Sequence, residues 1–448
     1  MSFTMELAPA ELTLQPAEQQ PRSAEELETR VLALVEELDD PNSWLHQNFY
    51  GPEGVTPTEM VRVDRPAAGH NIYVKNETEH HLEVDGQDFN ASTFKRRGAL
   101  LAALVAVRNN PNLERFVTAS AGNHALGVAF AAKSLGKEAH IYCRSDISPA
   151  KEAKLLELGA VLHKNSPNEP KGDTLETSMG YAKKAAIVEG AAGARPNHFI
   201  HPFDQIEVIA GQYTVGREIV DNLEAQHAAG AINIYEDDVE VDGAVGGGGH
   251  LAGIALALKN GKDQGRLGNN VTVRGARIEG GRLNTWCDGT ATDVGELPAL
   301  LLSDKRYVAG VDTISNVELA DAMVELTGVF NKMAEPAGSL SYALAKKRAA
   351  LLRMDALRAK HEAKTAEQRA AGLEEDPAPK PTTYITTFTG ANTARHIYEH
   401  FTDIRDAVYH KNLRYLGSLT GKRHWQEGGD PLAARQEGNP ALSGRVLR

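Results

Sequence analysis

The sequence has few cysteines, no long apolar run and no excess of positive charge. Only two cysteines, Cys143 and Cys287, occur among 448 residues, which excludes a disulfide framework, and no C-x-x-C spacing indicates a metal site. No segment approaches the ~18 uninterrupted apolar residues of a membrane span, and the N-terminus lacks the basic start and apolar run of a secretory signal. The formal net charge of −12 argues against a nucleic-acid partner or an anionic membrane surface. We therefore expect a reduced, soluble, cytoplasmic protein.

What is present is an alternation of short apolar runs and longer helical patterns, on the scale of two or three domains. Residues 1–22 are polar and contain proline without periodicity, so we expect disorder there, and helical spacing predicts a helix between Ser23 and Pro41. Strands are predicted at 71–77, 116–122, 138–144, 160–164, 239–249 and 271–279. Helices are predicted at 98–110, 123–136, 148–159 and 253–261. This alternation is typical of α/β units around a mostly parallel sheet.

Two further segments interrupt the alternation. Residues 345–380 combine a charged, alanine-rich helical stretch with a proline-rich linker, a composition typical of a solvated helix and a connector. The tail at 417–448 is polar with scattered glycine and proline, and we expect it to be irregular.

The first motif with chemical content is STFKRRGA, at 92–99. Lys95 stands just before a helix that we expect to begin near Gly98, where the helix dipole favours anions over cations. One interpretation is an ordinary surface lysine. The other is a lysine beside a bound anion or an aldehyde cofactor. Lysine forms Schiff bases once it is desolvated or lies near other cations, and Arg96 and Arg97 are adjacent.

The second motif is SAGNHALGVA, at 120–129, which joins a predicted strand to a predicted helix. Ser120, Asn123 and the backbone N–H groups at the helix start form a candidate site for a carboxylate. A simple capping turn is the alternative, because serine and asparagine are both good N-cap residues.

The third motif is GAVGGGGHLAG, at 243–253, with four consecutive glycines between an apolar strand and a helix expected to begin near His250. A glycine nest at a helix N-terminus is suited to hold a phosphate. No Lys-Ser/Thr pair follows, as it would in a nucleotide P-loop, and no acidic residue stands ~20 residues further on, as it would in a dinucleotide site. We therefore expect the phosphate to belong to another cofactor.

A phosphate cradle, a candidate Schiff-base lysine and a carboxylate loop together indicate pyridoxal phosphate acting on an amino acid. The motifs TFKRRGA, SAGNHALGVA, HPFDQIEVIAGQ, VGGGGHLAG and TGAN resemble, in this order over about residues 50–395, the threonine dehydratase and serine racemase branch of the fold-type II pyridoxal-phosphate enzymes. The resemblance implies a tryptophan synthase β-like α/β fold of two open twisted subdomains, with pyridoxal 5'-phosphate in the cleft between them. We expect these interleaved subdomains within a catalytic region at 23–416, the smaller at about 95–205, in a homo-oligomer that is a dimer.

The resemblance also implies roles for single residues. Lys95 matches the catalytic lysine that forms the Schiff base and exchanges the Cα proton, and Phe94 matches the residue packed beside the cofactor ring. Asn123 matches the residue bonded to the phenolic oxygen. Thr389 falls where the family has a hydroxyl or thiol facing the pyridine nitrogen, which suits α,β-elimination better than transamination.

Two loops complete the implied site. The phosphate loop and the residue after it, expected to bind the cofactor, are Gly246, Gly247, Gly248, Gly249 and His250. The loop expected to bind the substrate carboxylate is Ser120, Ala121, Gly122, Asn123 and His124.

Several positions depart from the family pattern. His250 stands where an apolar residue is common, and a phosphate close by would raise its pKa and keep it protonated; a capping histidine is the plainer interpretation. Ala121 stands where the racemases have a proton-exchanging serine, so we expect dehydration without racemisation. Glu279 matches a metal-site glutamate of the racemases, but Thr285 replaces the later acidic position, so no metal is predicted.

The implied activity is the pyridoxal-phosphate-dependent α,β-elimination of a β-hydroxy amino acid, such as threonine or serine, to a 2-oxo acid and ammonia. A β-replacement or β-elimination enzyme of the same fold, acting on another β-substituted and even phosphorylated or acidic amino acid, stays open. An apparent insertion at 84–91, Tyr213 and His250 alter the substrate side and motivate this alternative. A non-catalytic pyridoxal-phosphate binder and a Rossmann-type dehydrogenase are disfavoured by the retained lysine, glycines and ring-facing hydroxyl.

Overall fold

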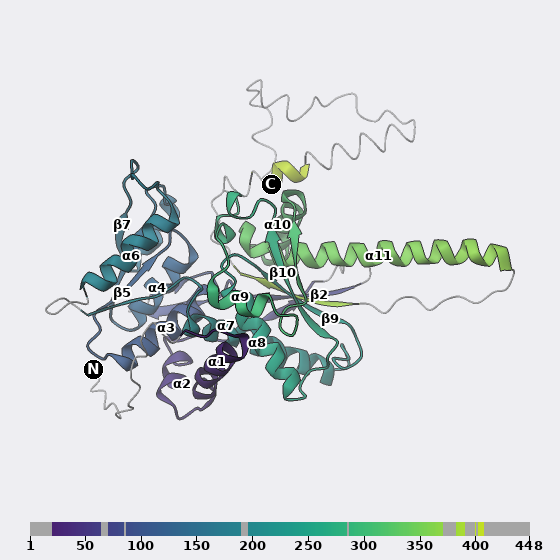
Figure 1. Ribbon diagram of the computed structural model, residues 1–448, viewed down its shortest axis with the longest axis horizontal. Coiled ribbons are helices and arrows are strands. Elements are labelled where there is room, and N and C mark those ends of the chain that lie inside the picture. Colours follow the sequence, from purple (N-terminus) through teal and green to yellow (C-terminus); the bar gives the residue numbers. More distant parts are fainter. Residues whose placement is uncertain are drawn as a thin grey trace, which may run out of the picture.

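Two open, mostly parallel sheets with helices packed around them form the body of the protein in this computed structural model (Figure 1). The structure describes residues 20–63, 70–84, 87–189, 196–284, 286–370, 382–389, 399 and 402–406. Of the segment 1–22 expected to be disordered, residues 1–19 lie outside the described residues, and so do the linker at 371–380 and the tail at 417–448. No helix in the described part of the chain is long and apolar enough to cross a membrane.

The larger sheet has six strands, and its five longer strands are mutually parallel where they pair. The edge strand β1 runs antiparallel to β2. In spatial order the strands are β1 (Met60–Arg62), β2 (Asn71–Asn76), β12 (Thr383–Phe388), β9 (Val239–Ala244), β10 (Val271–Ile278) and β11 (Gly310–Ile314). The chain therefore leaves this sheet after β2 and returns to it only after completing the smaller sheet.

The smaller sheet has four strands, all parallel where they pair. In spatial order they are β7 (Val161–Lys164), β6 (Glu138–Cys143), β5 (Arg115–Ala119) and β8 (Asn197–Phe199). The predicted α/β alternation is confirmed, because the expected strands and helices fall on these elements. The strand expected at 239–249 is shorter, since β9 ends at Ala244 and the glycines follow as a loop.

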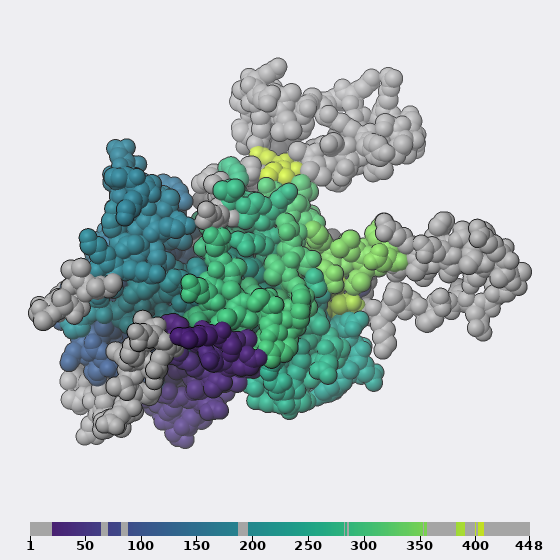
Figure 2. Space-filling model, in the orientation of Figure 1, coloured from purple at the N-terminus to yellow at the C-terminus, as the bar shows by residue number. Residues whose placement is uncertain are grey.

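Helices α1 to α11 cover the two sheets and fill the space between them. Those before residue 200 are α1 (Ala24–Asp39), α2 (Trp44–Phe49), α3 (Lys95–Asn109), α4 (Asn123–Ser134), α5 (Pro149–Glu157) and α6 (Leu175–Glu189). Those after it are α7 (Ile206–Ala228), α8 (Gly249–Asp263), α9 (Glu296–Leu302), α10 (Asn316–Phe330) and α11 (Pro336–Ala370). In the space-filling view α1 and α2, in purple, lie along the base of the molecule, where α1 packs on α7 and α2 on α3 (Figure 2).

The helix expected between Ser23 and Pro41 is α1, and its local sequence explains its start. The Ser23 side chain accepts a hydrogen bond from the backbone N–H of Glu26, which satisfies one of the amides that a helix start leaves unpaired. Apolar residues at helical spacing then face the core, and Leu27, Val31 and Leu38 are buried there.

Helix α7 brings the starts of α3 and α8 together, and glycines allow the close approach. A Cβ on Gly211 of α7 would lie 2.6 Å from the carbonyl oxygen of Arg97 in α3. A Cβ on Gly253 of α8 would lie 2.6 Å from the backbone of Gln212 in α7. Real Cβ contacts of this length do not occur, so larger residues would push the three helices apart. This packing places the first turn of α3, which begins at Lys95 (the lysine turn), beside the loop of glycines at 246–249 (the glycine loop).

Two segments noted in the sequence gain a structure of their own. Part of the apparent insertion at 84–91 forms a hairpin of β3 (His81–Val84) and β4 (Gln87–Asn90) ahead of the lysine turn. The charged stretch from 345 continues α11, a helix of 35 residues whose C-terminal part projects from the body in Figure 1.

Candidate functional site

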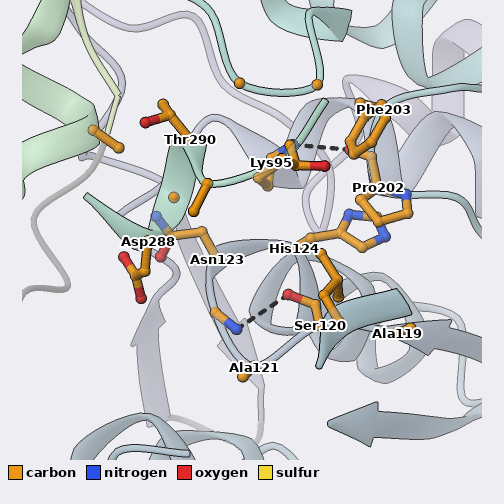
Figure 3. Close-up of a pocket in the computed structure, with 18 of the residues that line it drawn as sticks. Lys95, Ala119, Ser120, Ala121, Asn123, His124, Pro202, Phe203, Asp288 and Thr290 are labelled. Carbon is orange, nitrogen blue, oxygen red and sulfur yellow. Dashed lines mark hydrogen bonds between the residues drawn. The ribbon is translucent and has the colours of Figure 1, made fainter. Parts of the chain in front are cut away.

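A cavity of about 840 Å³ lies where the carboxyl ends of the parallel strands meet the helix starts (Figure 3). The strand β5 leads into Ser120, β9 leads into the glycine loop, and β12 leads into Thr389, so the position is the usual one for ligands of open α/β sheets. The candidate residues that line it are Phe94, Lys95, Ser120, Ala121, Gly122, Asn123, His124, Gly246, Gly247, Gly248, Gly249, His250 and Thr389. The structure thus gathers all of them around one space, although they come from segments almost 300 residues apart.

Lys95 is the first residue of α3, not a residue of the loop before a helix at Gly98 as the sequence led us to expect. Its Nζ donates a hydrogen bond of 2.8 Å to the carbonyl oxygen of Pro202 (Figure 3) and lies 5.0 Å from the centre of the Phe94 ring. Burial lowers the pKa of Lys95 to about 8. About a tenth of the amine is therefore uncharged and nucleophilic at pH 7.

The neighbouring arginines do not lower the pKa of Lys95, so of the two causes considered from sequence, desolvation and nearby cations, only desolvation operates. Burial alone accounts for that shift. The Arg96 guanidinium donates to backbone carbonyls, including those of Glu53 and Gly54. Arg97 has partners of its own in a buried ionic cluster, so its charge is compensated.

This buried ionic cluster fixes the first turn of α3 to the larger sheet and to α7. Arg97 Nε lies 2.8 Å from Glu77 Oε2 and its Nη1 lies 2.6 Å from Glu218 Oε1. Lys75 Nζ is 2.6 Å from Glu218 Oε2. The Arg97 charge holds the pKa of Glu77 well below its usual range, against the effect of burial. A buried pair of this kind is costly to break, so Lys95 begins a helix whose first turn is firmly anchored.

The glycine loop presents bare backbone toward the cavity, and its packing demands glycine. A Cβ on Gly247 would lie 2.1 Å from the Phe203 ring, and one on Gly249 would lie 2.8 Å from the Phe203 carbonyl oxygen. Gly248 has a φ of +87° and serves as the N-cap of α8. The first amides of α8 have no partner within the helix, and together with the helix dipole they favour an anion at this end.

The loop before α4 is the second candidate anion site. Gly122 is the N-cap of α4, and no side chain caps that helix. Ser120 Oγ instead accepts from the Gly122 amide at 3.1 Å (Figure 3). The capping role that the sequence offered for Ser120 and Asn123 is therefore not the one observed.

His124 is buried and uncharged. It lies 3.3 Å, through Nε2, from the carbonyl oxygen of Ile200. Its Nδ1 has no hydrogen-bond partner among the described residues. Burial holds its pKa well below the usual range, so Nδ1 is a buried acceptor without a partner in the described part of the chain.

His250 differs from the expectation of a protonated residue beside a phosphate. It is buried, and burial lowers its pKa to about 3. Nδ1 lies 3.1 Å from Gln212 Oε1 and Nε2 lies 3.3 Å from Thr387 Oγ1. Both ring nitrogens thus have protein partners, and the imidazole is neutral.

Several cavity residues were missed by the sequence interpretation. Lys151 of α5 is 15% exposed, its Nζ lies 3.5 Å from Asp288 Oδ2, and a Cβ on Gly122 would lie 3.7 Å from that Nζ. Pro202 and Phe203 lie in the quoted HPFDQIEVIAGQ motif but were assigned no role. Lys151 follows the N-cap and proline that start α5, and only the folded chain brings it to the carboxylate loop.

The sequence pattern of the family described as pyridoxal-phosphate dependent enzyme matches residues 52–359, well over half of the chain. The chain belongs to this family. The suspected resemblance and the cofactor are thereby confirmed, and the protein is a pyridoxal-phosphate-dependent enzyme of fold type II.

Two curated relatives share this family. L-threonine ammonia-lyase from Thermotoga maritima is 31% identical over 289 residues, which cover 61% of this chain and 62% of the relative. A biosynthetic L-threonine dehydratase from Bacillus subtilis is 29% identical over 325 residues, which cover 66% of each. The chain thus matches less than two thirds of the length of either relative.

Solved structures agree in fold. The processed form of threonine deaminase isoform 2 from Solanum lycopersicum has a TM-score of 0.60 at 20% identity, over 85% of this chain and 94% of that one. Serine racemase from Dictyostelium discoideum has a TM-score of 0.55 at 20% identity, over 82% of this chain and 98% of that one. At such identities the likeness concerns the fold, and it confirms the predicted tryptophan synthase β-like fold.

The cavity of this pyridoxal-phosphate-dependent enzyme fits its cofactor. The glycine loop lines the cavity with backbone, because its neighbours leave no room for a Cβ, and the partly uncharged Lys95 amine is suited to react with an aldehyde. No cluster of three or more metal-ligating side chains occurs within the described ranges.

Proposed function

We propose that this enzyme catalyses the α,β-elimination of a β-hydroxy amino acid, such as threonine or serine, to a 2-oxo acid and ammonia. The observation that carries the proposal is the desolvated Lys95 amine, with a pKa of about 8, in a cavity that two helix N-termini border. The relatedness at about 30% identity to threonine dehydratases supports the same reaction class.

Three groups of residues would hold the cofactor. The amides of Gly246–Gly249 and the start of α8 would bind its phosphate, and Phe94 would pack beside its ring. Asn123 and Thr389 would contact its polar edges. When bound, pyridoxal phosphate supplies an electron sink that stabilises negative charge at Cα of the amino acid.

The Ser120–His124 loop would orient the amino acid. The first amides of α4 point to a space where no side chain caps the helix, so they are available to a carboxylate. Lys151, whose Nζ lies close to Gly122, adds a positive charge beside these amides. Fixing the carboxylate by two contacts holds the Cα–H bond in a defined direction.

Lys95 would then act as the general base. Its Nζ would take the proton from Cα, and the electron pair of that bond would form the Cα–Cβ double bond as the Cβ–O bond breaks. The same proton, passed on from Lys95 to the leaving oxygen, would let the hydroxyl depart as water. The released enamine takes up one water, which replaces the nitrogen at Cα, and yields the 2-oxo acid and ammonia. A base with a pKa near the working pH is best suited to this transfer.

The test is a product assay on the purified holoenzyme with L-threonine, L-serine and a panel of β-phospho, β-acetoxy and β-amino acids. We expect a 2-oxo acid and ammonia in equal amounts from a β-hydroxy substrate, without formation of its D-isomer, because Ala121 cannot exchange a proton. A second arm adds a thiol. Thiol-dependent formation of a new amino acid, with no 2-oxo acid from any substrate, contradicts the proposal and favours β-replacement.

A further inference from the structure

His250 is enclosed by three segments that border the cavity. It is the second residue of α8 and is 6% exposed. Its imidazole contacts Gln212 of α7 through Nδ1 and Thr387 of β12 through Nε2. The ring centre lies 4.3 Å from that of Phe94, the residue before Lys95. One side chain thus joins the glycine loop, the lysine turn and the strand that leads to the ring-facing threonine.

Gln212 determines which nitrogen of His250 carries the proton. Gln212 Nε2 donates to the Phe94 carbonyl oxygen at 3.3 Å, so its Oε1 accepts from His250 Nδ1–H at 3.1 Å. His250 Nε2 then bears the lone pair and accepts from the Thr387 hydroxyl at 3.3 Å. In this series of hydrogen bonds, every donor meets an acceptor only when the imidazole is neutral.

The surroundings keep His250 in that neutral form. Burial lowers its pKa to about 3. Among the charged groups that face it, Glu77, in the turn after β2, opposes this effect, and Lys95 and Arg97 of α3 reinforce it. Because Gln212 and Thr387 already engage both ring nitrogens, His250 offers neither of them to a phosphate in this arrangement.

We propose that His250 is a positioning residue, which sets Lys95 relative to the glycine loop and Thr389 through the chain Phe94–Gln212–His250–Thr387. Phe94 is fixed on two sides, by the hydrogen bond to its carbonyl and by the ring contact. Thr387 lies two residues before Thr389, so its hydroxyl anchors the end of β12. The inference rests on the proposed role of Lys95 and on no particular substrate.

The chain offers a matched pair of variants on neighbouring residues. Thr387→Val removes the hydroxyl that contacts His250. Thr386→Val removes the hydroxyl of the preceding residue, which is also buried, faces the other side of the sheet and has no partner among the described residues. At position 250, His250→Leu removes both hydrogen bonds, while His250→Asn keeps a donor at about the place of Nδ1.

Two measurements report on Lys95 without amino-acid turnover. They are the dissociation constant of pyridoxal phosphate from the holoenzyme and the rate at which the apoenzyme combines with it. We expect His250→Leu to weaken binding and slow the reaction about tenfold, and His250→Asn to restore both to within about threefold of wild type, because loss of a buried hydrogen bond typically has an effect of this order. Thr387→Val should fall between them, and Thr386→Val should match wild type.

Wild-type binding and rate in His250→Leu would overturn the proposal. So would an asparagine variant no better than leucine, or equal losses in Thr386→Val and Thr387→Val. If the leucine variant does not fold, the valine pair decides alone. These measurements distinguish failure of this proposal from failure of the proposed function. If the enzyme catalyses another reaction, no 2-oxo acid forms, but the cofactor affinities and rates stay as expected here.

Discussion

Asn123 Nδ2 donates a hydrogen bond of 2.6 Å to Glu335 Oε1 across the cavity. Asn123 begins α4 beside the smaller sheet, and Glu335 directly precedes α11 on the larger sheet. This charge-assisted bond joins the two halves of the molecule at the edge of the proposed cofactor site. The resemblance assigns the same amide to the phenolic oxygen of the cofactor, so under the proposed function Glu335 would also orient a side chain that binds the cofactor.

Asn123→Ala should weaken cofactor binding. A hydrogen bond to a charged group contributes about 1.5–3 kcal/mol, so we expect the dissociation constant of pyridoxal phosphate to rise about ten- to hundredfold. Glu335→Gln keeps an acceptor of the same shape and should stay within about threefold of wild type. Equilibrium dialysis measures both. Wild-type affinity in the alanine variant would remove Asn123 from the cofactor site.

Lys151→Met should raise KM for the amino acid about tenfold with little change in kcat. Loss of a cation beside the carboxylate loop removes an interaction made in ground state and transition state alike. Asp288→Asn should lower KM, because the carboxylate 3.5 Å from Lys151 Nζ no longer competes for it. Lys164→Met is the control, since Lys164 pairs with Glu152 away from the cavity. Steady-state kinetics of the four proteins decide, and an unchanged KM in Lys151→Met excludes the substrate contact.

The apoenzyme should combine with pyridoxal phosphate faster as the pH rises toward 8. Burial lowers the pKa of Lys95 from 10.5 to about 8, so the reactive uncharged amine increases about tenfold per pH unit below that value and levels off above it. Stopped-flow absorbance measures this rate as a function of pH, over a range of about pH 6–10 that includes the pKa expected for Lys95. A midpoint near the ordinary lysine value would mean that Lys95 is solvated.

Asp242 of β9 should make the protein less stable as the pH rises. It is buried, and neither carboxylate oxygen has a partner in the described part of the chain. Burial raises its pKa well above 3.8, and nearby Glu240 adds to the shift. The folded state therefore keeps a proton that the unfolded state loses, and between the unfolded and folded pKa values stability falls with pH by at most about 1.4 kcal/mol per unit.

Asp242→Asn removes that titration and should raise the melting temperature at pH 7 more than at pH 4. The exposed Asp263→Asn is the control and should leave the pH dependence as it is. Parallel melting curves for wild type and Asp242→Asn at all pH values would show that Asp242 is ionised in the fold.

The fold and the cavity lining were accessible from sequence through local patterns and through the family resemblance that the motifs carry. Apolar runs of strand and helix length lie on the observed elements. In the glycine loop, Gly248 is required by a φ of +87°, and Gly247 and Gly249 by contacts with Phe203. Lys95 stood out because the helix dipole disfavours a positive charge at a helix start.

The charge states were not accessible, because they depend on burial and on partners far along the chain. His250 is neutral because Gln212 and Thr387 meet it from other elements. Arg97 is compensated by Glu77 and Glu218, which stand 20 and 121 residues away. No local spacing encodes these contacts.

The most direct test of the central claim is to locate the covalently bound cofactor. The holoenzyme is reduced with borohydride, digested and mapped by mass spectrometry, with Lys95→Ala treated in parallel. We expect a pyridoxyl-phosphate adduct on Lys95, and a folded Lys95→Ala protein with neither adduct nor 2-oxo acid production. An adduct on another lysine, or wild-type activity in Lys95→Ala, would contradict the account.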